Sequence, residues 1–323
     1  MAEPIDHAAA SATEAAASVA GVGITAVERD TGINKETLRV WERRYGFPAP
    51  GRDAAGERLY PAEQVQKLHL IKRLLDAGHR PGRIVAAPAQ ELAALLQPPA
   101  GAARPEAADE APEIAACAAL LQAHDIDGLR HALSQALLRR GLAGGVTEVL
   151  APLTTRVGEL WMAGTLQVFE EHIFSECLQL VLRQAIQALP ASRGGGPRVL
   201  LTTLPGEGHA LGLLMAEALL CLEGAACLSL GVQTPPAQLP GAVAAHRADV
   251  VALSFSSQLP NRVVLEGLAE LRALLAPEVE IWAGGSSRAL RLPGVPKGVN
   301  CLEGLTAIAP ATARWRKLLE SRL

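Results

Sequence analysis

Two histidines stand where an imidazole could bind a ligand or a metal ion. His209 belongs to Glu207-Gly208-His209-Ala210-Leu211-Gly212, which directly follows the apolar run Arg198–Leu204. Such a run predicts a strand that leads through a loop into a helix, and ligands bind at the carboxyl ends of strands in open α/β sheets. We therefore expect His209 to face a ligand rather than a hydrophobic core.

The second histidine, His172, ends the segment Trp161-Met-Ala-Gly-Thr-Leu-Gln-Val-Phe-Glu-Glu-His172. On a helix, Val168, Glu171 and His172 occupy positions i, i+3 and i+4 and therefore share one face. Trp161 offers a flat apolar surface, and Glu171 offers an acceptor for hydroxyl groups. Taken alone, the segment is explained more simply by a core tryptophan beside a solvated Glu-Glu-His run.

Two further clusters follow predicted strands. Ser254-Phe-Ser256 ends the apolar run that begins at Asp249, and Gly284-Gly285 follows the run Val279–Ala283. Glycines at a strand end let a ligand approach the backbone closely. Both clusters are therefore expected beside His209, at the same edge of the sheet.

The elements that must position these residues follow from the hydrophobic pattern. From residue 198 to 323, short apolar runs alternate with helical patterns, which predicts a doubly wound, flavodoxin-like α/β domain with a parallel sheet. The predicted strands cover residues 198–204, 225–230, 249–254, 279–283 and 298–301. The predicted helices cover residues 209–223, 236–246, 261–275, 286–291 and 303–319.

Upstream of this domain the pattern is helical. Residues 113–190 predict a four-helix bundle, with helices at 113–123, 126–141, 143–162 and 167–189. Residues 22–85 predict a compact helical unit. The Ala/Ser-rich residues 1–21 are expected to be disordered, and the Pro/Ala-rich residues 86–112 are expected to form a linker with one short helix near 90–97.

The first helical unit has the pattern of a DNA-binding head. A helix, a tight turn at Gly32 and a second helix capped by Asn34 are predicted. The second helix carries arginines of the kind that recognition helices present to the major groove, and a basic turn follows that could clamp the sugar-phosphate backbone. The candidate DNA-contacting residues are Thr37, Arg39, Trp41, Arg43, Arg44, Tyr45, Arg52, Arg58 and Tyr60.

The segment Thr37-Leu-Arg39-Val-Trp41-Glu-Arg43-Arg44-Tyr45-Gly46, with Arg58-Leu-Tyr60, resembles the MerR family of winged helix-turn-helix regulators. The resemblance covers about residues 22–85 and implies docking on near-palindromic operator DNA as a dimer. Because no long heptad helix follows the head, dimerisation is expected to come from the C-terminal body. The alternative is a helical interaction module whose arginines are merely solvated.

Charge and composition agree with this organisation. Residues 21–85 hold 12 Lys and Arg against 8 Asp and Glu, whereas the rest of the 323 residues holds 18 against 25. This distribution fits a nucleic-acid-binding head on an acidic body. We find neither a transmembrane stretch nor a signal peptide, so a cytosolic protein without membrane partners is predicted. The five cysteines lack CxxC spacing, which favours reduced, buried thiols over a metal or disulfide role.

The elements Glu207-x-His209-x-x-Gly212, Ser254-x-Ser256 and Gly284-Gly285 resemble the DxHxxG, SxL/SxT and GG marks of cobalamin-binding domains such as that of methionine synthase, with Glu207 in place of Asp. The resemblance implies that His209 ligates cobalt from the lower face and displaces the cofactor's dimethylbenzimidazole. Gly212, Gly284 and Gly285 would leave room for the displaced tail, and Ser254 or Ser256 would hydrogen-bond it. Imidazole is a good Co(III) ligand, and a nearby carboxylate can hold its other nitrogen. The alternative is a flavodoxin-like module with another planar ligand, or with none.

Trp161-x9-Glu171-His172 resembles the Wx9EH element of CarH-type light-sensing repressors, which are similar to this chain over nearly its whole length. The resemblance implies that Trp161, Val168 and Glu171 shelter the adenosyl group of adenosylcobalamin. It also implies that His172 ligates cobalt from above once light has cleaved the Co–C bond. A homo-oligomer, a dimer or by resemblance a homotetramer, would grip DNA through several heads.

The sequence thus predicts a multidomain transcription regulator, not an enzyme, whose assembly is gated by adenosylcobalamin. One alternative is a regulator that senses another chromophore, a redox state or a ligand without cobalamin photochemistry. Another is a cobalamin-independent MerR-type regulator with a vestigial pocket. A corrinoid methyl carrier or mutase subunit is the third, and the DNA-binding head and the lack of a barrel-sized catalytic domain argue against it.

Overall fold

The computed structural model describes residues 21–53, 55–76, 79–96, 111–190 and 194–321. The chain divides into two compact units, a head within Met1–Ala102 and a body within Ala103–Leu323. The segment predicted to be disordered lies outside the described residues except for Gly21, and most of the predicted linker lies outside them as well.

The head is a winged helix-turn-helix, as predicted. Gly32, at φ +67°, makes the tight turn between the first two helices, and the Asn34 side chain caps the second helix by accepting a hydrogen bond from the backbone N–H of Glu36. Three antiparallel strands pair in the order β1-β3-β2, and β2 and β3 form the wing. The elements are β1 (Gly21–Gly23), α1 (Ile24–Thr31), α2 (Lys35–Tyr45), β2 (Gly51–Arg52), β3 (Arg58–Pro61), α3 (Ala62–Asp76), α4 (Pro81–Ile84) and α5 (Ala89–Leu96).

The head extends further along the chain than the predicted boundary at residue 85. Leu92 of α5 is fully buried in the same core as Leu38 of α2 and Leu68 of α3. Helix α5 therefore packs onto the head, because its apolar face completes that core. The short helix expected inside the linker is present, but it is part of the folded unit.

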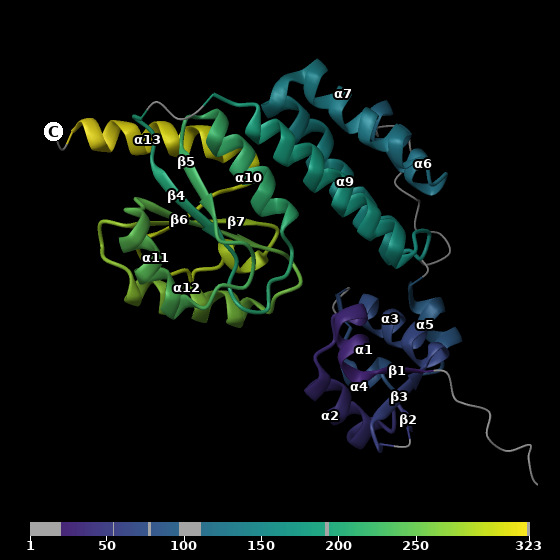
Figure 1. The fold of residues 1–323 in the computed structure, drawn as a ribbon. Coiled ribbons are helices and arrows are strands. Elements are labelled where there is room, and N and C mark those ends of the chain that lie inside the picture. The colour runs from purple at the N-terminus through teal and green to yellow at the C-terminus, as the bar shows by residue number, and fades with distance from the viewer. Residues whose placement is uncertain (1–20, 54, 77–78, 97–110, 191–193, 322–323) are drawn as a thin grey trace, which may run out of the picture. The chain divides into compact units, whose positions relative to one another are not determined.

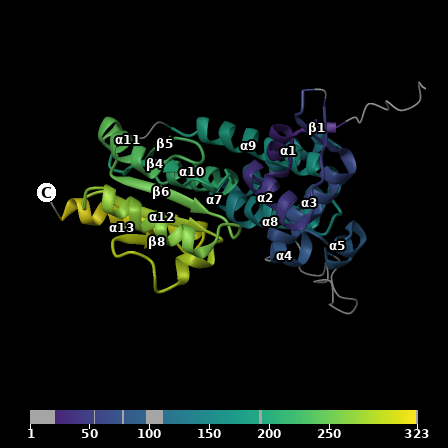
Figure 2. The same ribbon diagram turned by 90° about the horizontal axis from the view of Figure 1, so that it is seen from below.

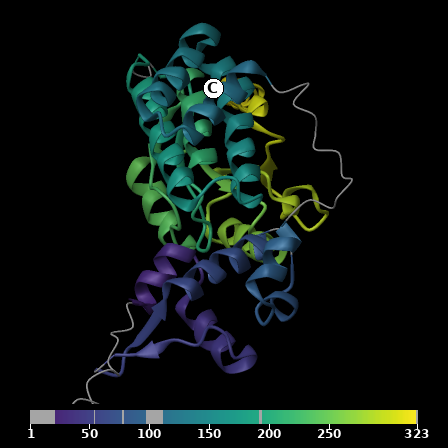
Figure 3. The ribbon, with the colours of Figure 1, turned by 90° about the vertical axis from the view of Figure 1, so that its right-hand side faces the viewer.

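The first part of the body is the predicted helical bundle. Its elements are α6 (Pro112–Gln122), α7 (Ile126–Gly144), the π-helical turn η1 (Gly145–Leu150), α8 (Ala151–Met162) and α9 (Val168–Gln187). Gly141 interrupts α7 with φ +68° and ψ +168°, which only glycine adopts readily. In Figure 3 these helices, coloured blue to teal, lie side by side in front of the sheet elements.

The second part of the body is a five-stranded parallel sheet in the order β5-β4-β6-β7-β8. The strands are β4 (Arg198–Thr202), β5 (Ala226–Ser229), β6 (Val250–Phe255), β7 (Glu280–Gly285) and β8 (Val299–Cys301). The connecting elements are α10 (Leu211–Leu222), η2 (Pro236–Gln238), α11 (Leu239–His246), α12 (Asn261–Leu274), η3 (Arg288–Arg291), η4 (Leu305–Ala307) and α13 (Ile308–Glu320). The doubly wound fold is confirmed.

Helices cover both faces of this sheet, with α10 and α13 on one side and α11 and α12 on the other (Figures 1 and 2). Alternate residues of β6 enter two separate cores, because successive strand side chains point to opposite faces. Val250 and Ala252 face the α10 side, whereas Val251 and Leu253 face the α12 side. A strand buried on both faces explains the continuous apolar run in the sequence.

The bundle and the sheet share one hydrophobic core. Leu178 and Val181 of α9 belong to the same buried cluster as Leu214 of α10 and Leu201 of β4. Helix α10 is therefore packed between the bundle and the sheet, and it begins two residues after His209. This packing fixes the orientation of the helix that follows the candidate ligand loop.

Candidate cofactor site and DNA interface

His209 lies in the loop that joins β4 to α10, at the carboxyl end of the strand as predicted. Its side chain is 53% exposed, and its Nδ1 contacts the Glu207 carboxylate oxygen Oε1. A ring held through Nδ1 offers Nε2 to a ligand. The contact thus selects the nitrogen that can bind a metal, which is the role of outer-shell carboxylates at metal-bound histidines.

Glu207 is a buried carboxylate with a full set of partners. It is 1% exposed, and its two oxygens accept hydrogen bonds from the backbone N–H groups of His209 (3.0 Å) and Ser256 (2.6 Å). Burial raises the pKa of Glu207, but these hydrogen bonds and that with the His209 ring outweigh it, so the pKa lies below its usual value. The group is therefore a charged carboxylate that ties the His209 loop to the end of β6.

The two serines of the second cluster differ in what they contribute. Ser256 uses its backbone N–H to hold Glu207, and its hydroxyl oxygen accepts a hydrogen bond from the N–H of Gln258 at 3.3 Å. Ser254 points toward the start of α10, because a Cβ placed on Gly212 would lie 3.1 Å from the Ser254 Oγ. Both serines are partly buried, and Ser254 is the better placed to keep its hydroxyl for a ligand.

The two glycines Gly284 and Gly285, expected to make room for a ligand, differ in whether packing within the chain requires glycine. Gly285 has φ +116°, and a Cβ there would lie 2.1 Å from the carbonyl oxygen of Phe255. The neighbouring strand therefore already requires glycine at this position, and the expected role of Gly285 beside a cofactor stays a prediction. At Gly284 a Cβ would meet only Leu302, at 3.8 Å or more, so packing within the chain does not demand glycine there.

Sequence reasoning missed the threonine and glutamine network beneath the His209 loop. The buried Thr203 hydroxyl donates to the carbonyl oxygen of Glu207 at 2.6 Å and accepts from the N–H of Gln233 at 2.8 Å. Thr202 bonds to Thr234 at 2.7 Å, and the Gln233 side chain accepts from the N–H of Gly206 at 3.3 Å. The loop after β5 therefore braces the loop that carries His209.

The bundle residues occupy the predicted helix face. Trp161 is partly buried near the end of α8, and Val168, Glu171 and His172 lie in the first turns of α9. The His172 side chain is 64% exposed, and its Nε2 lies 3.8 Å from Oε2 of Glu171. The other Glu171 oxygen accepts a hydrogen bond from the Ser175 hydroxyl at 2.7 Å. These contacts orient Glu171 and leave the His172 ring largely in solvent.

A buried Glu170 secures this helix start, and the sequence analysis did not single it out. Glu170 Oε2 accepts a hydrogen bond from the backbone N–H of Gln167 at 2.6 Å, which forms a capping box with the Gln167 side chain. Its Oε1 lies 2.9 Å from Nε2 of His124, at the turn between α6 and α7. His124 therefore pins the first turn of the helix that carries Glu171 and His172.

The pair His209 and Glu207 fits a metal ion that is already bound within a macrocycle. Within the described part of the chain, no group of three or more His, Cys, Asp or Glu side chains could hold a bare metal ion. One exposed imidazole, oriented by a buried carboxylate, could supply the single ligand that a metal ion within a macrocycle needs from the protein. A corrinoid is such a group, so the residues present fit it.

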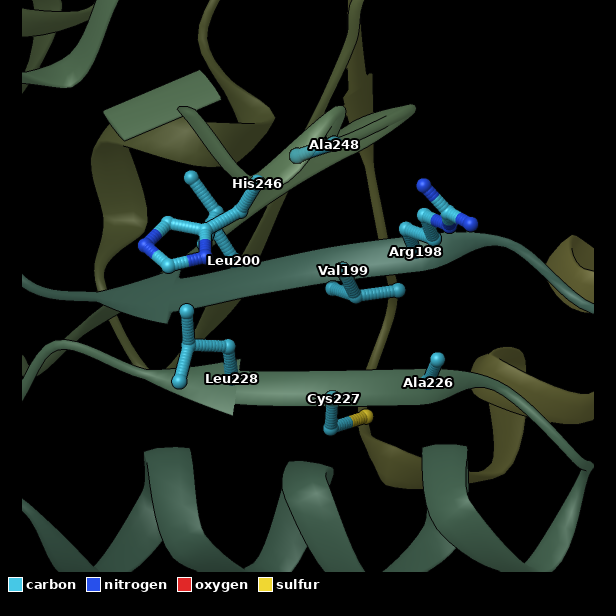
Figure 4. A pocket seen from close by; sticks show the side chains of 8 residues that line it. All are labelled: Arg198, Val199, Leu200, Ala226, Cys227, Leu228, His246 and Ala248. Carbon is cyan, nitrogen blue, oxygen red and sulfur yellow. The ribbon is translucent and has the colours of Figure 1, made fainter. Parts of the chain in front are cut away.

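A pocket of about 330 Å³ lies elsewhere, at the amino-terminal ends of β4 and β5 (Figure 4). It is lined by Arg198, Val199, Leu200, Ala226, Cys227, Leu228, His246 and Ala248. Because His209 follows the carboxyl end of β4, this pocket is not the candidate cofactor site.

In the head, the arginines of α2 form the exposed face of the second helix. Arg39 and Arg43 are four residues apart and both exposed, and Arg44 is exposed beside them with its guanidinium 5.4 Å from the Tyr45 ring centre. Thr37, near the helix start, is partly exposed. This face has the charge and position expected of a recognition helix.

The wing adds two more arginines. Arg52 and Arg58 are register partners across β2 and β3. Arg52 donates a hydrogen bond to the carbonyl oxygen of Gly56 at 2.7 Å, whereas Arg58 donates through Nε to Oε2 of Glu42 at 2.9 Å. Arg58 thus links the wing to the recognition helix, and Arg52 is exposed at the hairpin.

Trp41 and Tyr60 do not lie at this surface, which corrects the expectation that they contact DNA. Trp41 is 5% exposed and Tyr60 is fully buried, and both belong to the core of the head. Leu38, Trp41 and Tyr45 recur at i, i+3 and i+7, which is the inward face of α2. The two aromatic residues therefore support the helix that presents the arginines.

Comparison with known proteins gives the same division of the chain. Residues 23–87 match the model of the MerR HTH family regulatory protein, and residues 113–186 and 197–291 match two models each described as a B12 binding domain. Among solved structures, the monomethylamine corrinoid protein of Methanosarcina barkeri aligns at 15% identity over 62% of this chain and 96% of that chain, with a TM-score of 0.48. No helix in the described part of the chain has the length and apolar character needed to cross a bilayer.

Two relatives cover most of the chain. The HTH-type transcriptional repressor CarH of Myxococcus xanthus is 33% identical over 261 residues, which is 79% of this chain and 86% of that protein. CarA of the same organism, also an HTH-type transcriptional repressor, is 33% identical over 233 residues, or 72% of this chain and 75% of that protein. The chain therefore belongs to the family of MerR-type transcriptional repressors with B12-binding domains that includes CarH and CarA.

Proposed function

We propose that the protein is a light-responsive transcriptional repressor of the cytoplasm whose assembly on DNA is gated by adenosylcobalamin. The observation that carries the proposal is the geometry around His209. An exposed imidazole follows the carboxyl end of β4, and a buried, charged Glu207 holds it. Similarity to CarH and CarA over most of the chain supports the step from corrinoid binding to gene repression.

In this proposal the chain's own residues hold the cofactor from both sides. His209 would bind cobalt through Nε2, and Glu207 would keep the ring oriented. Gly284 would leave space for the nucleotide tail, and the Ser254 hydroxyl would hydrogen-bond it. Trp161, Val168 and Glu171 would enclose the adenosyl group. When bound, adenosylcobalamin supplies a cobalt–carbon bond that visible light breaks.

Because the bundle and the sheet share one hydrophobic core, a change at the cofactor site would affect how protomers assemble. Helix α10 follows the His209 loop and packs against α9, which carries Glu171 and His172. A change at the cofactor would therefore act on two helices of one packed body, and through them on the surfaces that pair protomers. Several heads on one duplex raise affinity without new contacts, so loss of assembly would release DNA steeply.

The test measures assembly and DNA retardation with full-length protein. DNA that binds is first selected from a random pool by protein loaded with adenosylcobalamin in darkness. Protein without cofactor, loaded protein kept dark, loaded protein under green light, and protein with hydroxocobalamin are then compared by light scattering and gel retardation. We expect the largest assembly and the strongest retardation only in the dark, adenosylcobalamin-loaded sample.

Equal assembly and retardation in darkness and light would overturn light gating but not cobalamin binding. Equal behaviour with and without cofactor would overturn gating altogether. DNA retardation that requires adenosylcobalamin but is the same in darkness and under light would identify a cobalamin sensor that is not a photoreceptor.

After illumination His172 would be a cobalt ligand, because its ring is 64% exposed on the face of α9 that carries Glu171. The variant His172→Ala should keep dark DNA binding and change the absorption spectrum recorded after light. An unchanged illuminated spectrum would remove His172 from this role.

A further inference from the structure

A side chain of α3 holds the loop that leads from the recognition helix α2 into the wing. This loop covers residues 46–50, and its Ala49 is bound by Gln64 of α3. Gln64 Oε1 accepts a hydrogen bond from the Ala49 N–H at 2.9 Å, and Gln64 Nε2 donates to the Ala49 carbonyl oxygen at 2.7 Å. We call these two bonds the Gln64 clamp. In the described part of the head, the clamp supplies all hydrogen bonds of the Ala49 backbone.

The same helix contacts the loop a second time, about one turn further along. The Lys67 ammonium group lies 3.9 Å from the centre of the Phe47 ring, and Phe47 also packs against the core of the head. Lys67 follows Gln64 by three residues, so both side chains leave the same face of α3. The loop is therefore fastened to α3 at two of its residues, Phe47 and Ala49.

The hairpin end of the wing is braced by its own hydrogen bonds. Asp53 Oδ1 accepts hydrogen bonds from the N–H groups of Ala55 at 2.9 Å and Glu57 at 2.8 Å. Arg52 donates to the carbonyl oxygen of Gly56 at 2.7 Å. A hairpin end braced in this way moves as one unit. The position of Arg52 therefore depends on what anchors the two strands of the wing.

These two strands differ in how firmly they are anchored. β3 pairs with β1, continues directly into α3, and is joined to α2 by the hydrogen bond from Arg58 to Glu42. In the described sheet, β2 pairs with β3 alone, at Gly51 and Arg52. So short a pairing is marginal by itself. The Gln64 clamp, which holds the residue two positions before Gly51, is therefore the second anchor of the strand that carries Arg52.

We propose that Gln64 is a positioning residue for DNA binding, because it places Arg52 against the sugar-phosphate backbone beside the recognition helix. Arg52 is exposed, and its guanidinium carries the positive charge that phosphate contacts require. Gln64 is half-buried and uses both of its polar atoms on Ala49, so it acts through the loop. The proposal rests on DNA binding by the MerR-type head and not on the proposed response to light.

Loss of the clamp should therefore resemble loss of Arg52 itself. Without the clamp, β2 would separate from β3 part of the time, and the Arg52 guanidinium would spread over many positions. A phosphate contact made only part of the time releases fewer counterions. Gln64→Met removes both hydrogen bonds but keeps the length of the side chain. It should weaken binding to all DNA sequences alike and reduce the dependence of affinity on salt.

Fluorescence anisotropy with full-length protein tests this over a salt series. One duplex is selected from a random pool by the wild type, and the other is a scrambled duplex of the same length. All variants are measured in the cofactor state in which the wild type binds most tightly. We expect Arg52→Ala and Gln64→Met each to lower the slope of log affinity against log salt by about 1 for each bound head. At about 0.15 M salt, one lost phosphate contact weakens binding by about 5-fold for each head.

A double-mutant cycle separates positioning from a purely structural role. If Gln64 acts through Arg52, the double variant should bind DNA no more weakly than Arg52→Ala alone. Losses of affinity that add in the double variant would overturn the proposal. So would an unchanged salt slope in Gln64→Met, even if that variant is less stable in urea. The matched control is Gln66→Met, an exposed glutamine of the same helix, which should keep the wild-type affinity and slope.

Hydrogen exchange of the wild type keeps the proposal testable if Gln64→Met fails to fold. Proline has no N–H, so Ala49 supplies the only amide proton between Pro48 and Pro50, and a fragment that covers these residues reports on the clamp alone. We expect this amide to be protected in the free protein and further protected on DNA. Exchange at the rate of an unstructured amide in the free protein would overturn the proposal.

Discussion

At the scale of single residues, the candidate cofactor site depends on one buried charge. Glu207 is 1% exposed yet ionised, because it accepts hydrogen bonds from the His209 and Ser256 backbones and contacts the His209 ring. A charged group at such a depth is costly unless all its lone pairs are satisfied. The contacts that stabilise this charge also orient His209 and join the loops that follow β4 and β6.

Replacing Glu207 tests this arrangement. Glu207→Gln keeps the side chain's size but loses its charge, and its amide has only one oxygen, so it can accept only one of the hydrogen bonds that the His209 and Ser256 backbones donate. We expect cobalamin affinity to fall about 10- to 100-fold, the usual effect of removing an outer-shell partner. Glu207→Asp, which keeps the charge, should lose less. Equilibrium dialysis measures the affinity.

The exposed Glu278, before β7, provides the matched control. Glu278→Gln should bind cobalamin as the wild type does. Wild-type affinity in Glu207→Gln, with its circular dichroism spectrum unchanged, would contradict the role assigned to Glu207.

Residue-level roles were only partly predictable from the sequence. The position of His209 follows from a strand-like run that ends in a polar loop, and Glu207 follows from its spacing to His209. Thr203 and Gln233 could not be found, because their hydrogen bond joins residues 30 positions apart. Trp41 was placed at the DNA surface because it stands among arginines, although its spacing to Leu38 and Tyr45 indicates the inward face.

At the scale of elements, the contact between the α6–α7 turn and the start of α9, called the joint below, positions the bundle residues of the candidate site. The helix begins with a capping box at Gln167 and Glu170, and His124 reaches Glu170 from the turn between α6 and α7. Periodicity predicted the four helices because each buries one apolar stripe. It could not predict this joint, which rests on side chains 46 positions apart.

Removing His124 should loosen that joint. In His124→Ala, Oε1 of the buried Glu170 loses its partner, and we expect a loss of about 1 to 3 kcal/mol in the free energy of unfolding. Urea denaturation followed by circular dichroism measures it. The matched control is His131→Ala, an exposed histidine on α7, which should change stability by no more than about 0.5 kcal/mol.

A loss of stability in His124→Ala as small as that in His131→Ala would contradict the role of His124 in the joint. A loss of stability without weaker binding of adenosylcobalamin would show that the joint holds the bundle together but does not position Glu171 and His172.

At the scale of the whole molecule, the chain combines a basic head with a body in which the bundle and one face of the sheet share a hydrophobic core. The composition predicted this division through its charge distribution, and the comparisons place a MerR-type model on residues 23–87 and B12-binding models on the body. The sequence placed the head's end at residue 85, because Pro and Ala dominate the residues beyond it. The structure extends the head through α5, since Leu92 fills its core.

The head's arginines should contribute through phosphates or base edges, and salt dependence separates the two. If Arg43 contacts a phosphate, Arg43→Ala should weaken binding to all DNA sequences alike and reduce the slope of log affinity against log salt by about 1. Fluorescence anisotropy over a salt series gives the slope. Arg262→Ala, an exposed arginine of the body, should leave it unchanged. An unaltered slope with altered sequence preference would instead assign Arg43 to a base edge.

The proposed function requires that His209 would supply the nitrogen that binds the cobalt of a corrinoid. Electron paramagnetic resonance tests it directly, using full-length protein loaded with unlabelled cob(II)alamin and made with either ordinary or ¹⁵N-labelled histidine. We expect the nitrogen splitting of the cobalt signal to change from a triplet to a doublet with labelled histidine, and we expect His209→Ala to abolish this change. A triplet that persists with labelled histidine would mean that the cofactor keeps its own base and that His209 is not its ligand.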